Sequence, residues 1–151
     1  MAFAARIEEL RIVSPSVGAP LGNYVHAKRV GNLLYLSGKG PPDNNGKAPR
    51  GKLGAGMSVE EGYQHARGVG LVPIAVMRDA LDRDLARIED IVKVLVSSMQ
   101  PPISRIIPTS SMAARICLSR RLASVAGTRV RAVGMSSQRG GIPVEIEVMI
   151  K

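Results

Sequence analysis

Two glutamates near the C-terminus, Glu145 and Glu147, are the residues best placed for acid–base chemistry. They alternate with apolar residues in the run VEIEV, which predicts a β-strand with one apolar face and one face that carries both carboxylates. Such a pair can simply belong to a solvated strand face. Alternatively, one carboxylate lines a cleft between subunits, where it would orient or deprotonate a water molecule.

Other catalytic arrangements find little support in the sequence. No Ser-His-Asp or Cys-His pattern is present, and Cys117 lies among apolar residues, where a role in the core is expected. His26 and His65 are too few to suggest a zinc site, so we expect no metal and no cofactor. Residues 40–47 loosely resemble a phosphate-binding loop, but the spacing is wrong and no Ser or Thr follows the lysine.

The pattern of apolar residues predicts the elements that would position these glutamates. Helices are expected over 3–11, 58–81 and 111–126, and strands over 24–30, 32–37, 88–96, 130–135 and 144–150. Ser58 and Glu61 have the spacing of a capping box, and Pro73 predicts a kink in the same helix. Long helices between strands favour a mixed sheet with one covered face, so the other face needs a partner subunit.

The composition indicates one small domain. The chain has 151 residues, 45% of them hydrophobic, so a single domain over residues 1–151 is expected. No apolar run is long enough to span a bilayer, and the N-terminal residues read as an amphipathic helix rather than a signal peptide. One cysteine fits a reducing compartment, so we expect a cytoplasmic protein without a membrane partner.

The positive charge belongs to one segment. The formal charge of +9 would suggest a nucleic-acid partner, but residues 91–143 hold eight basic residues and no acidic one, and so account for +8 of it. The aromatic residues all precede this segment, which therefore offers no rings on which bases could stack. For this reason a nucleic-acid partner is not expected.

Three segments, which together span 86 of the 151 residues, resemble one known family of small proteins, the RidA/YjgF family, also labelled endoribonuclease L-PSP. Residues 19–41 resemble its N-terminal hairpin, with a Gly-x-Tyr turn and a Gly-Asn strand that ends in Ser-Gly. Residues 51–95 resemble its central Glu-x-x-x-x-Ala-Arg helix and the Leu-x-Arg strand that follows. Residues 133–150 resemble the closing hairpin that ends in Val-Glu-Ile-Glu, and the whole is most similar to the longer subgroup with an added N-terminal helix.

The resemblance implies a fold, an assembly and an activity. The fold is α+β and chorismate-mutase-like, a mixed sheet with two helices on one face, plus the short N-terminal helix. The assembly is a homotrimer that binds a small molecule in clefts between subunits. The activity is hydrolysis of imines or enamines, in which an arginine holds the substrate carboxylate and a glutamate serves the hydrolytic water.

Matching by position assigns the site residues that the resemblance implies. Glu145 is the catalytic glutamate, and the substrate-binding positions are Tyr24, Ser37, Gly38, Lys39, Val130 and Arg131. Lys39 stands where glutamine is usual, and Val130 stands at the position expected for the arginine. Arg131 is adjacent, but neighbouring residues of a strand point to opposite faces.

Residues 97–131 match no pattern of the family, although their number fits without a gap. Related chains carry aspartate where Ile103 and Ile116 stand and histidine where Ile107 stands. The codons GAT and CAT, each followed by C and read one base late, give the isoleucine codon ATC. We therefore hypothesise two compensating frameshifts near codons 97 and 131, with ordinary divergence as the alternative; in the neighbouring frame position 130 would be arginine.

The sequence thus favours a deaminase-type hydrolase or small-metabolite binder. One alternative is an endoribonuclease or RNA-binding protein, which the basic charge would support. Another is a trimer that binds a ligand without catalysis, which the valine at position 130 would favour.

Overall fold

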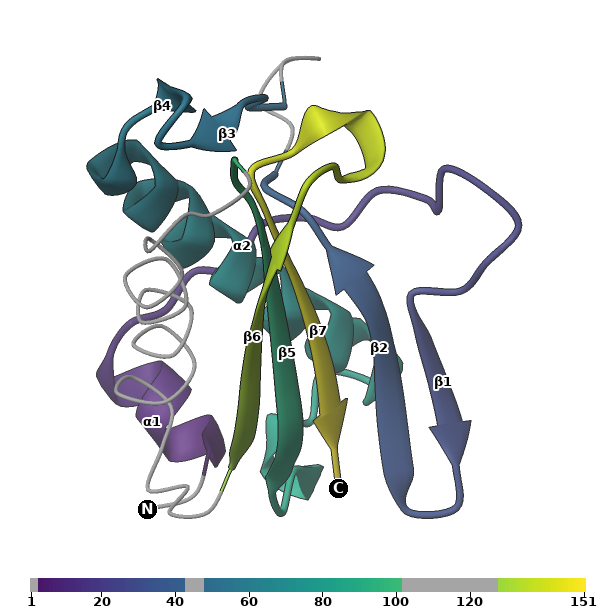
Figure 1. The fold of residues 1–151 in the computed structure, drawn as a ribbon. Coiled ribbons are helices and arrows are strands. Elements are labelled where there is room, and N and C mark those ends of the chain that lie inside the picture. Colours follow the sequence, from purple (N-terminus) through teal and green to yellow (C-terminus); the bar gives the residue numbers. More distant parts are fainter. Residues whose placement is uncertain (1–2, 43–47, 102–127) are drawn as a thin grey trace.

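Five strands form one mixed sheet in the computed structural model, which describes residues 3–42, 48–101 and 128–151 (Figure 1). The strands are β1 (Ala27–Val30), β2 (Leu33–Lys39), β5 (Ile91–Met99), β6 (Arg129–Met135) and β7 (Val144–Ile150). They lie in the order β1-β2-β7-β5-β6, in which β5 and β6 are parallel and all other neighbours are antiparallel. The predicted α+β class with a mixed sheet is confirmed.

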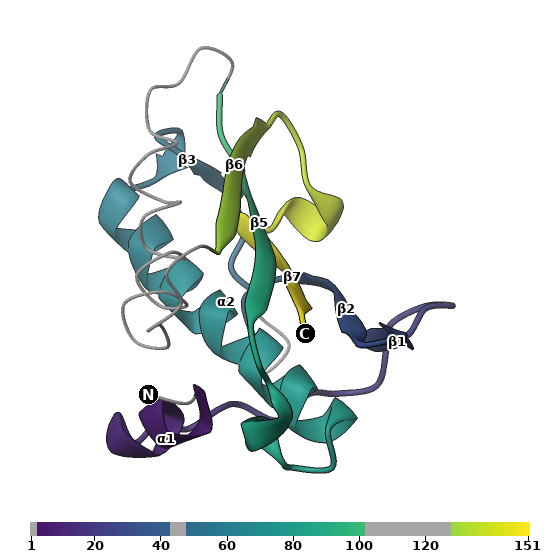
Figure 2. The same cartoon turned by 90° about the horizontal axis from the view of Figure 1, so that it is seen from below.

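Helix α2 (Val59–Ala80) covers one face of this sheet and passes behind it in Figure 1. Figure 2 shows the same helix lying along one side of the strands. Its buried side includes Val69, Ile74 and Met77, which pack in one core with the buried side chains of β7. In β7 these are alternate residues, Val144, Ile146, Val148 and Ile150, as the period-two pattern predicted.

The ends of α2 follow the expected signals. Ser58 accepts a hydrogen bond from the backbone N–H of Glu61, and the Glu61 carboxylate accepts one from the backbone N–H of Ser58, so the capping box is confirmed. The helix continues through Pro73, which is buried, and ends at Ala80. None of the helices in the described part of the chain is long and apolar enough to cross a membrane.

The remaining elements are short. Helix α1 (Phe3–Glu9) buries Phe3 and Ile7 and packs near the 3₁₀ turn η1 (Leu85–Arg87). Strands β3 (Lys52–Leu53) and β4 (Gly56–Met57) form a small separate ribbon, and the turn η3 (Arg139–Gly141) lies between β6 and β7. The helix predicted over 111–126 and Cys117 lie outside the described residues.

Two strand starts differ from the prediction by three residues, and the others agree to within one. β1 begins at Ala27 rather than residue 24, so that Tyr24 belongs to an extended segment before the strand. β5 begins at Ile91 rather than residue 88, and an irregularity between Ile91 and Lys93 shifts its register against β7. Ile91 therefore lies in the core and not, as predicted, on the side of Lys93.

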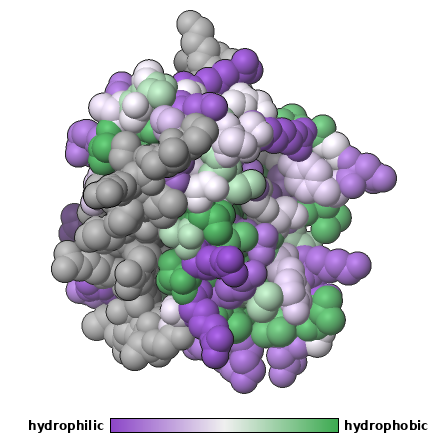
Figure 3. Space-filling view, viewed as in Figure 1, coloured by the Kyte–Doolittle hydropathy of each residue, from purple (hydrophilic) through white to green (hydrophobic). Residues whose placement is uncertain are grey.

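None of the described elements covers the face of the sheet opposite α2, which we call the open face (Figure 1). Register pairing joins Lys93 to Met149, Leu95 to Glu147 and Ser97 to Glu145, and directly paired residues share a face. This face also carries Tyr35 and Met135, whose exposed fractions are 40% and 43%. In the view of Figure 3, hydrophobic and hydrophilic residues lie side by side over the strands.

Candidate functional site

The predicted residues of the N-terminal hairpin gather where β2 runs past the end of β1. The Ser37 hydroxyl donates a hydrogen bond to the carbonyl oxygen of Val25 at 2.6 Å, and the Ser37 backbone N–H donates to the carbonyl of His26 at 3.0 Å. These two bonds hold the extended segment that carries Tyr24 alongside β2. Ser37 therefore helps to position the segment before β1 by binding the carbonyl groups of Val25 and His26.

Gly38 makes room for the carboxylate of Glu145. A β-carbon built on Gly38 would overlap this carboxylate, standing 2.8 Å from Cδ and 3.2 Å from Cγ of Glu145. The register between β2 and β7 shifts between Leu36 and Lys39, so the glycine lies in a local irregularity of the sheet. The sequence prediction that Gly38 and Glu145 belong to one site is consistent with this contact.

The same irregularity turns Lys39 away from Glu145. Lys39 pairs with the buried Ile146 and is itself only 6% exposed, so it lies on the side of the sheet covered by α2. Its Nζ is 2.8 Å from Nδ1 of His26 and 5.7 Å from the centre of the Tyr24 ring. Burial lowers the pKa of Lys39, and the charge of Glu145 opposes this by raising it.

His26 belongs to this cluster, although the sequence marked it only as one of two histidines. Its Nε2 is 2.7 Å from the carbonyl oxygen of Gly18, and its ring meets that of Tyr24 edge to face, with centroids 5.9 Å apart. A carbonyl oxygen only accepts hydrogen bonds, so Nε2 carries the proton and Nδ1 accepts from Lys39. The contact between His26 and Lys39 depends on the irregularity in β2, and no sequence pattern predicts that irregularity.

A cavity of about 530 Å³ opens beside this cluster. Its polar side chains are Ser16, Tyr24, His26 and Lys39, and the rest of the wall is glycine or apolar, with Val72 supplied by α2. Glu145 is not among the lining residues and lies behind Gly38. Tyr24 and Lys39 therefore face a pocket that is separate from the carboxylate.

Val130 and Arg131 lie on β6, at the far side of the sheet from β1. Val130 pairs with the buried Val94 and packs against the core, whereas Arg131 pairs with Leu95 and therefore shares the open face with Glu147. β5 separates β6 from β7, so Arg131 and Glu145 do not meet within the chain. Glu147 instead lies 3.7 Å from the Nζ of Lys93.

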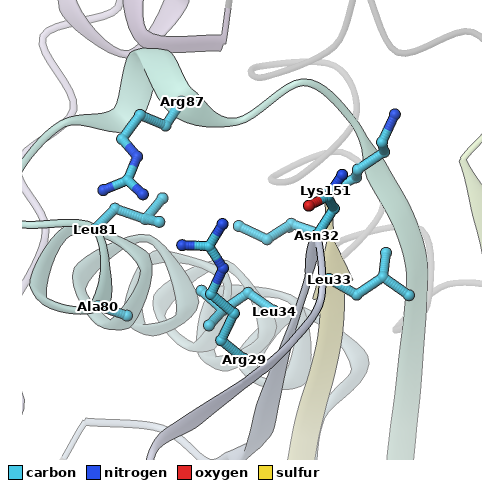
Figure 4. Close-up of a pocket in the computed structure, with 9 residues that line it drawn as sticks. Arg29, Asn32, Leu33, Leu34, Ala80, Leu81, Arg87 and Lys151 are labelled. Carbon is cyan, nitrogen blue, oxygen red and sulfur yellow. The ribbon is translucent and has the colours of Figure 1, made fainter.

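A second cavity, of about 90 Å³, is basic (Figure 4). The guanidinium groups of Arg29 and Arg87 point toward one another across it, with Leu81 beside them. None of its lining residues is acidic, and none belongs to the predicted site, so it offers no base for hydrolysis. In the described part of the chain no group of histidine, cysteine or acidic side chains could hold a metal ion.

Known proteins are similar to the chain in sequence and in fold. No protein-family model matches the chain. Protein TCP17 of Trypanosoma cruzi is 32% identical over 150 residues, which cover 98% of this chain and 92% of that protein. The crystal structure of Atu1372 from Agrobacterium tumefaciens superposes with a TM-score of 0.84 at 26% identity, covering 99% of this chain and 91% of the other.

RidA itself has the same fold. The crystal structure of RidA from a Psychrobacter species superposes with a TM-score of 0.57 at 20% identity, covering 87% of this chain and 90% of that chain. The motifs in residues 19–41, 51–95 and 133–150 lie on the hairpin, helix and strands expected for them. In its motifs and in this fold the chain is therefore similar to the RidA/YjgF family.

Proposed function

We propose that the chain is an imine or enamine deaminase-type hydrolase that acts on small substrates in clefts between the subunits of a homotrimer. The observation that carries this proposal is the placement of Glu145, whose carboxylate packs against Gly38 beside the hairpin that holds Ser37 and Tyr24. A carboxylate on an open sheet face, close to exposed backbone, is suited to orient a water molecule.

The proposed reaction needs only water and two protein groups. Glu145 accepts a proton from water as the water oxygen attacks the imine carbon, and it then passes this proton to the nitrogen. The resulting amino alcohol releases ammonia and leaves a carbonyl compound. A guanidinium group fits the substrate carboxylate because its planar fork binds both oxygens. Arg131 takes this role in the proposal, since Val130 faces the core.

A second copy of the chain is needed to bring these groups together. Within one chain, Arg131 and Glu145 are separated by two strand spacings across the sheet and by two residues along it. Their Cα atoms are therefore on the order of 12 Å apart. The open face also exposes Tyr35 and Met135, which oligomerisation would cover. We therefore assign Glu145 and Arg131 of one cleft to neighbouring subunits.

Hydrolysis of 2-aminoacrylate or its imine, generated in solution and followed by release of the 2-oxo acid or of ammonia, tests the proposal. We expect Glu145→Gln to lower the rate by about 100-fold or more, as for loss of a general base. Glu147→Gln is the matched control, because it removes a carboxylate from the same face of the same strand and should leave most of the activity. Equal rates in both variants would exclude the role assigned to Glu145.

An RNA-binding function is the second candidate, and the observation in its favour is charge. The described basic residues Lys93, Arg129 and Arg131 lie on the open face by register, within a chain of formal charge +9. RNA binding that weakens steeply with rising salt, together with no imine hydrolysis, would favour this candidate. Ligand binding with no turnover by the unmodified protein would instead indicate a non-catalytic trimer.

A further inference from the structure

The amine of Lys39 is buried, and none of the acidic residues that the structure describes forms an ion pair with it. The residue is 6% exposed. Its polar neighbour is the imidazole of His26, 2.8 Å away, and the Tyr24 ring lies to one side. A buried ammonium is costly unless an opposite charge is paired with it, so these surroundings raise the neutral fraction of the amine above that of an exposed lysine.

Hydrogen bonding defines what the amine can do. Because the Nε2 proton of His26 is directed at the carbonyl of Gly18, Nδ1 offers a lone pair and accepts from Lys39. A neutral amine that donates one N–H to Nδ1 keeps its own lone pair. Lys39 also lines the cavity of about 530 Å³, so this lone pair is within reach of a small molecule there.

The cavity wall indicates the class of molecule that would enter. Pro15, Val17, Leu21, Pro42 and Val72 give it an apolar lining, and none of its lining residues is acidic. Its apolar part suits a small compound with an aliphatic chain. A carbonyl carbon is the electrophile with which a neutral lysine amine reacts reversibly.

We propose that Lys39 is the nucleophile of a second site, at which its amine binds a small aliphatic aldehyde or ketone covalently as a Schiff base. The Nζ lone pair attacks the carbonyl carbon, and His26 Nδ1 takes a proton from Nζ and returns it to the carbonyl oxygen. The carbinolamine then loses water, which carries away the oxygen and both N–H protons and leaves a carbon–nitrogen double bond. No oxidant or reductant is involved, and hydrolysis of the imine reverses the step.

The groups around Lys39 set the expected pH dependence. Among the described residues, the titratable groups that interact with it are Tyr24 and His26 from the segment before β1 and, through its charge on the other side of the sheet, Glu145 of β7, whereas the α2 residue that lines the same cavity is Val72. Burial lowers the pKa of Lys39 below its ordinary value of 10.5, and Glu145 partly opposes the shift. A larger fraction of Lys39 is therefore neutral at pH 7 than of an exposed lysine.

Reductive trapping of the full-length protein tests this site. Butanal and cyanoborohydride are added at pH 7, and the rate of butylation is measured at each lysine by peptide mapping. We expect Lys39 to react about tenfold or more faster than the half-exposed Lys93 and Lys151, with a rate that rises through a pKa below 10.5. Labelling of Lys39 no faster than that of Lys93 and Lys151 would overturn the proposal.

Three variants separate this site from the others. His26→Ala should slow labelling of Lys39 by about tenfold, as for loss of a proton-transfer group, and His65→Ala, at the other histidine, should not. Equal rates in both would overturn the role of His26, provided that thermal unfolding shows both variants folded. Glu145→Gln should leave the trapping intact or faster, because it removes the charge that raises the pKa of Lys39, so this site and the proposed hydrolysis can fail independently.

Discussion

Gly38 and Glu145 illustrate how a single contact can define the candidate site. The glycine has no β-carbon, and the Glu145 carboxylate occupies the space where that carbon would lie. A larger residue at position 38 would therefore displace the carboxylate of the proposed base while Glu145 itself stays unmutated. The role of Glu145 can therefore be tested through its neighbour.

Replacement of Gly38 by alanine should displace Glu145. We expect a loss of hydrolysis of about 100-fold from the misplaced carboxylate, with destabilisation of about 1–3 kcal/mol from overpacking. Gly68→Ala is the control, because a β-carbon there meets only Pro42, at 3.7 Å, and alanine in a helix is favoured by up to about 1 kcal/mol. Activity that survives Gly38→Ala unchanged would contradict the placement of Glu145.

The residues of the site were predictable from the sequence to different degrees. Ser37, Gly38 and Glu145 lie in motifs that place them on strands, and Tyr24 lies in the segment before the first strand of the same hairpin, so their closeness to one hairpin could be expected. The sequence did not place Lys39 beside His26, because the irregularity in β2 reverses the face on which Lys39 lies. The roles assigned to Glu145, Val130 and Arg131 stay predictions.

At the scale of elements, α2 depends on its first turn. The backbone N–H groups of that turn have no partner within the helix, and Ser58 and Glu61 satisfy two of them reciprocally. We expect Ser58→Ala to lower the free energy of unfolding by about 1 kcal/mol, measured by urea denaturation. Ser137→Ala, at an exposed serine after β6, should change it little.

The same cap makes part of the stability pH-dependent. Hydrogen bonds from Ser58 lower the pKa of Glu61 in the folded protein below 4.5, the ordinary value that applies to the unfolded chain. The stability that these bonds contribute is therefore fully present above pH 4.5 and is lost as the pH falls through the lower pKa of the folded protein. The difference between the native protein and Ser58→Ala should therefore shrink below pH 4.5. A difference that stays constant down to acid unfolding would argue against the cap.

The elements with clear periodicity were predicted well, and their boundaries less so. β7 and α2 have apolar residues at strand and helix spacing, and they form close to where the pattern placed them. The face of Ile91 was predicted wrongly because one extra residue between Ile91 and Lys93 shifts the pairing, and tertiary packing rather than local pattern decides such shifts. The two-residue ribbon of β3 and β4 is too short to give a periodic signal.

The basic segment allows a direct test at the level of the gene. If residues 97–131 arise from two compensating frameshifts, the confirmed DNA for codons 95–133, read in the neighbouring frame, should encode the aspartates and histidines of related chains and an arginine at position 130. DNA that encodes no such pattern would leave divergence as the explanation. Arg131 would then be the arginine on the open face beside the Val130 position.

At the scale of the whole molecule, sheet order decides how the site is built. Glu145 lies on the central strand β7, and Arg131 lies on the edge strand β6, with β5 between them (Figure 1). In the proposed trimer another chain would cover the exposed Tyr35 and Met135 of the same face. The account therefore requires that each cleft takes its base from one subunit and its arginine from the next.

Subunit complementation tests this requirement most directly. Trimers made only of Glu145→Gln or only of Arg131→Ala chains should each lack most of the imine hydrolysis. After the two variants are unfolded and reassembled in equal amounts, each mixed trimer contains one cleft with both residues intact, so activity should recover to about a quarter of that of the native protein. No recovery, in a sample whose mixed trimers are verified by native mass spectrometry, would contradict a cleft shared between subunits.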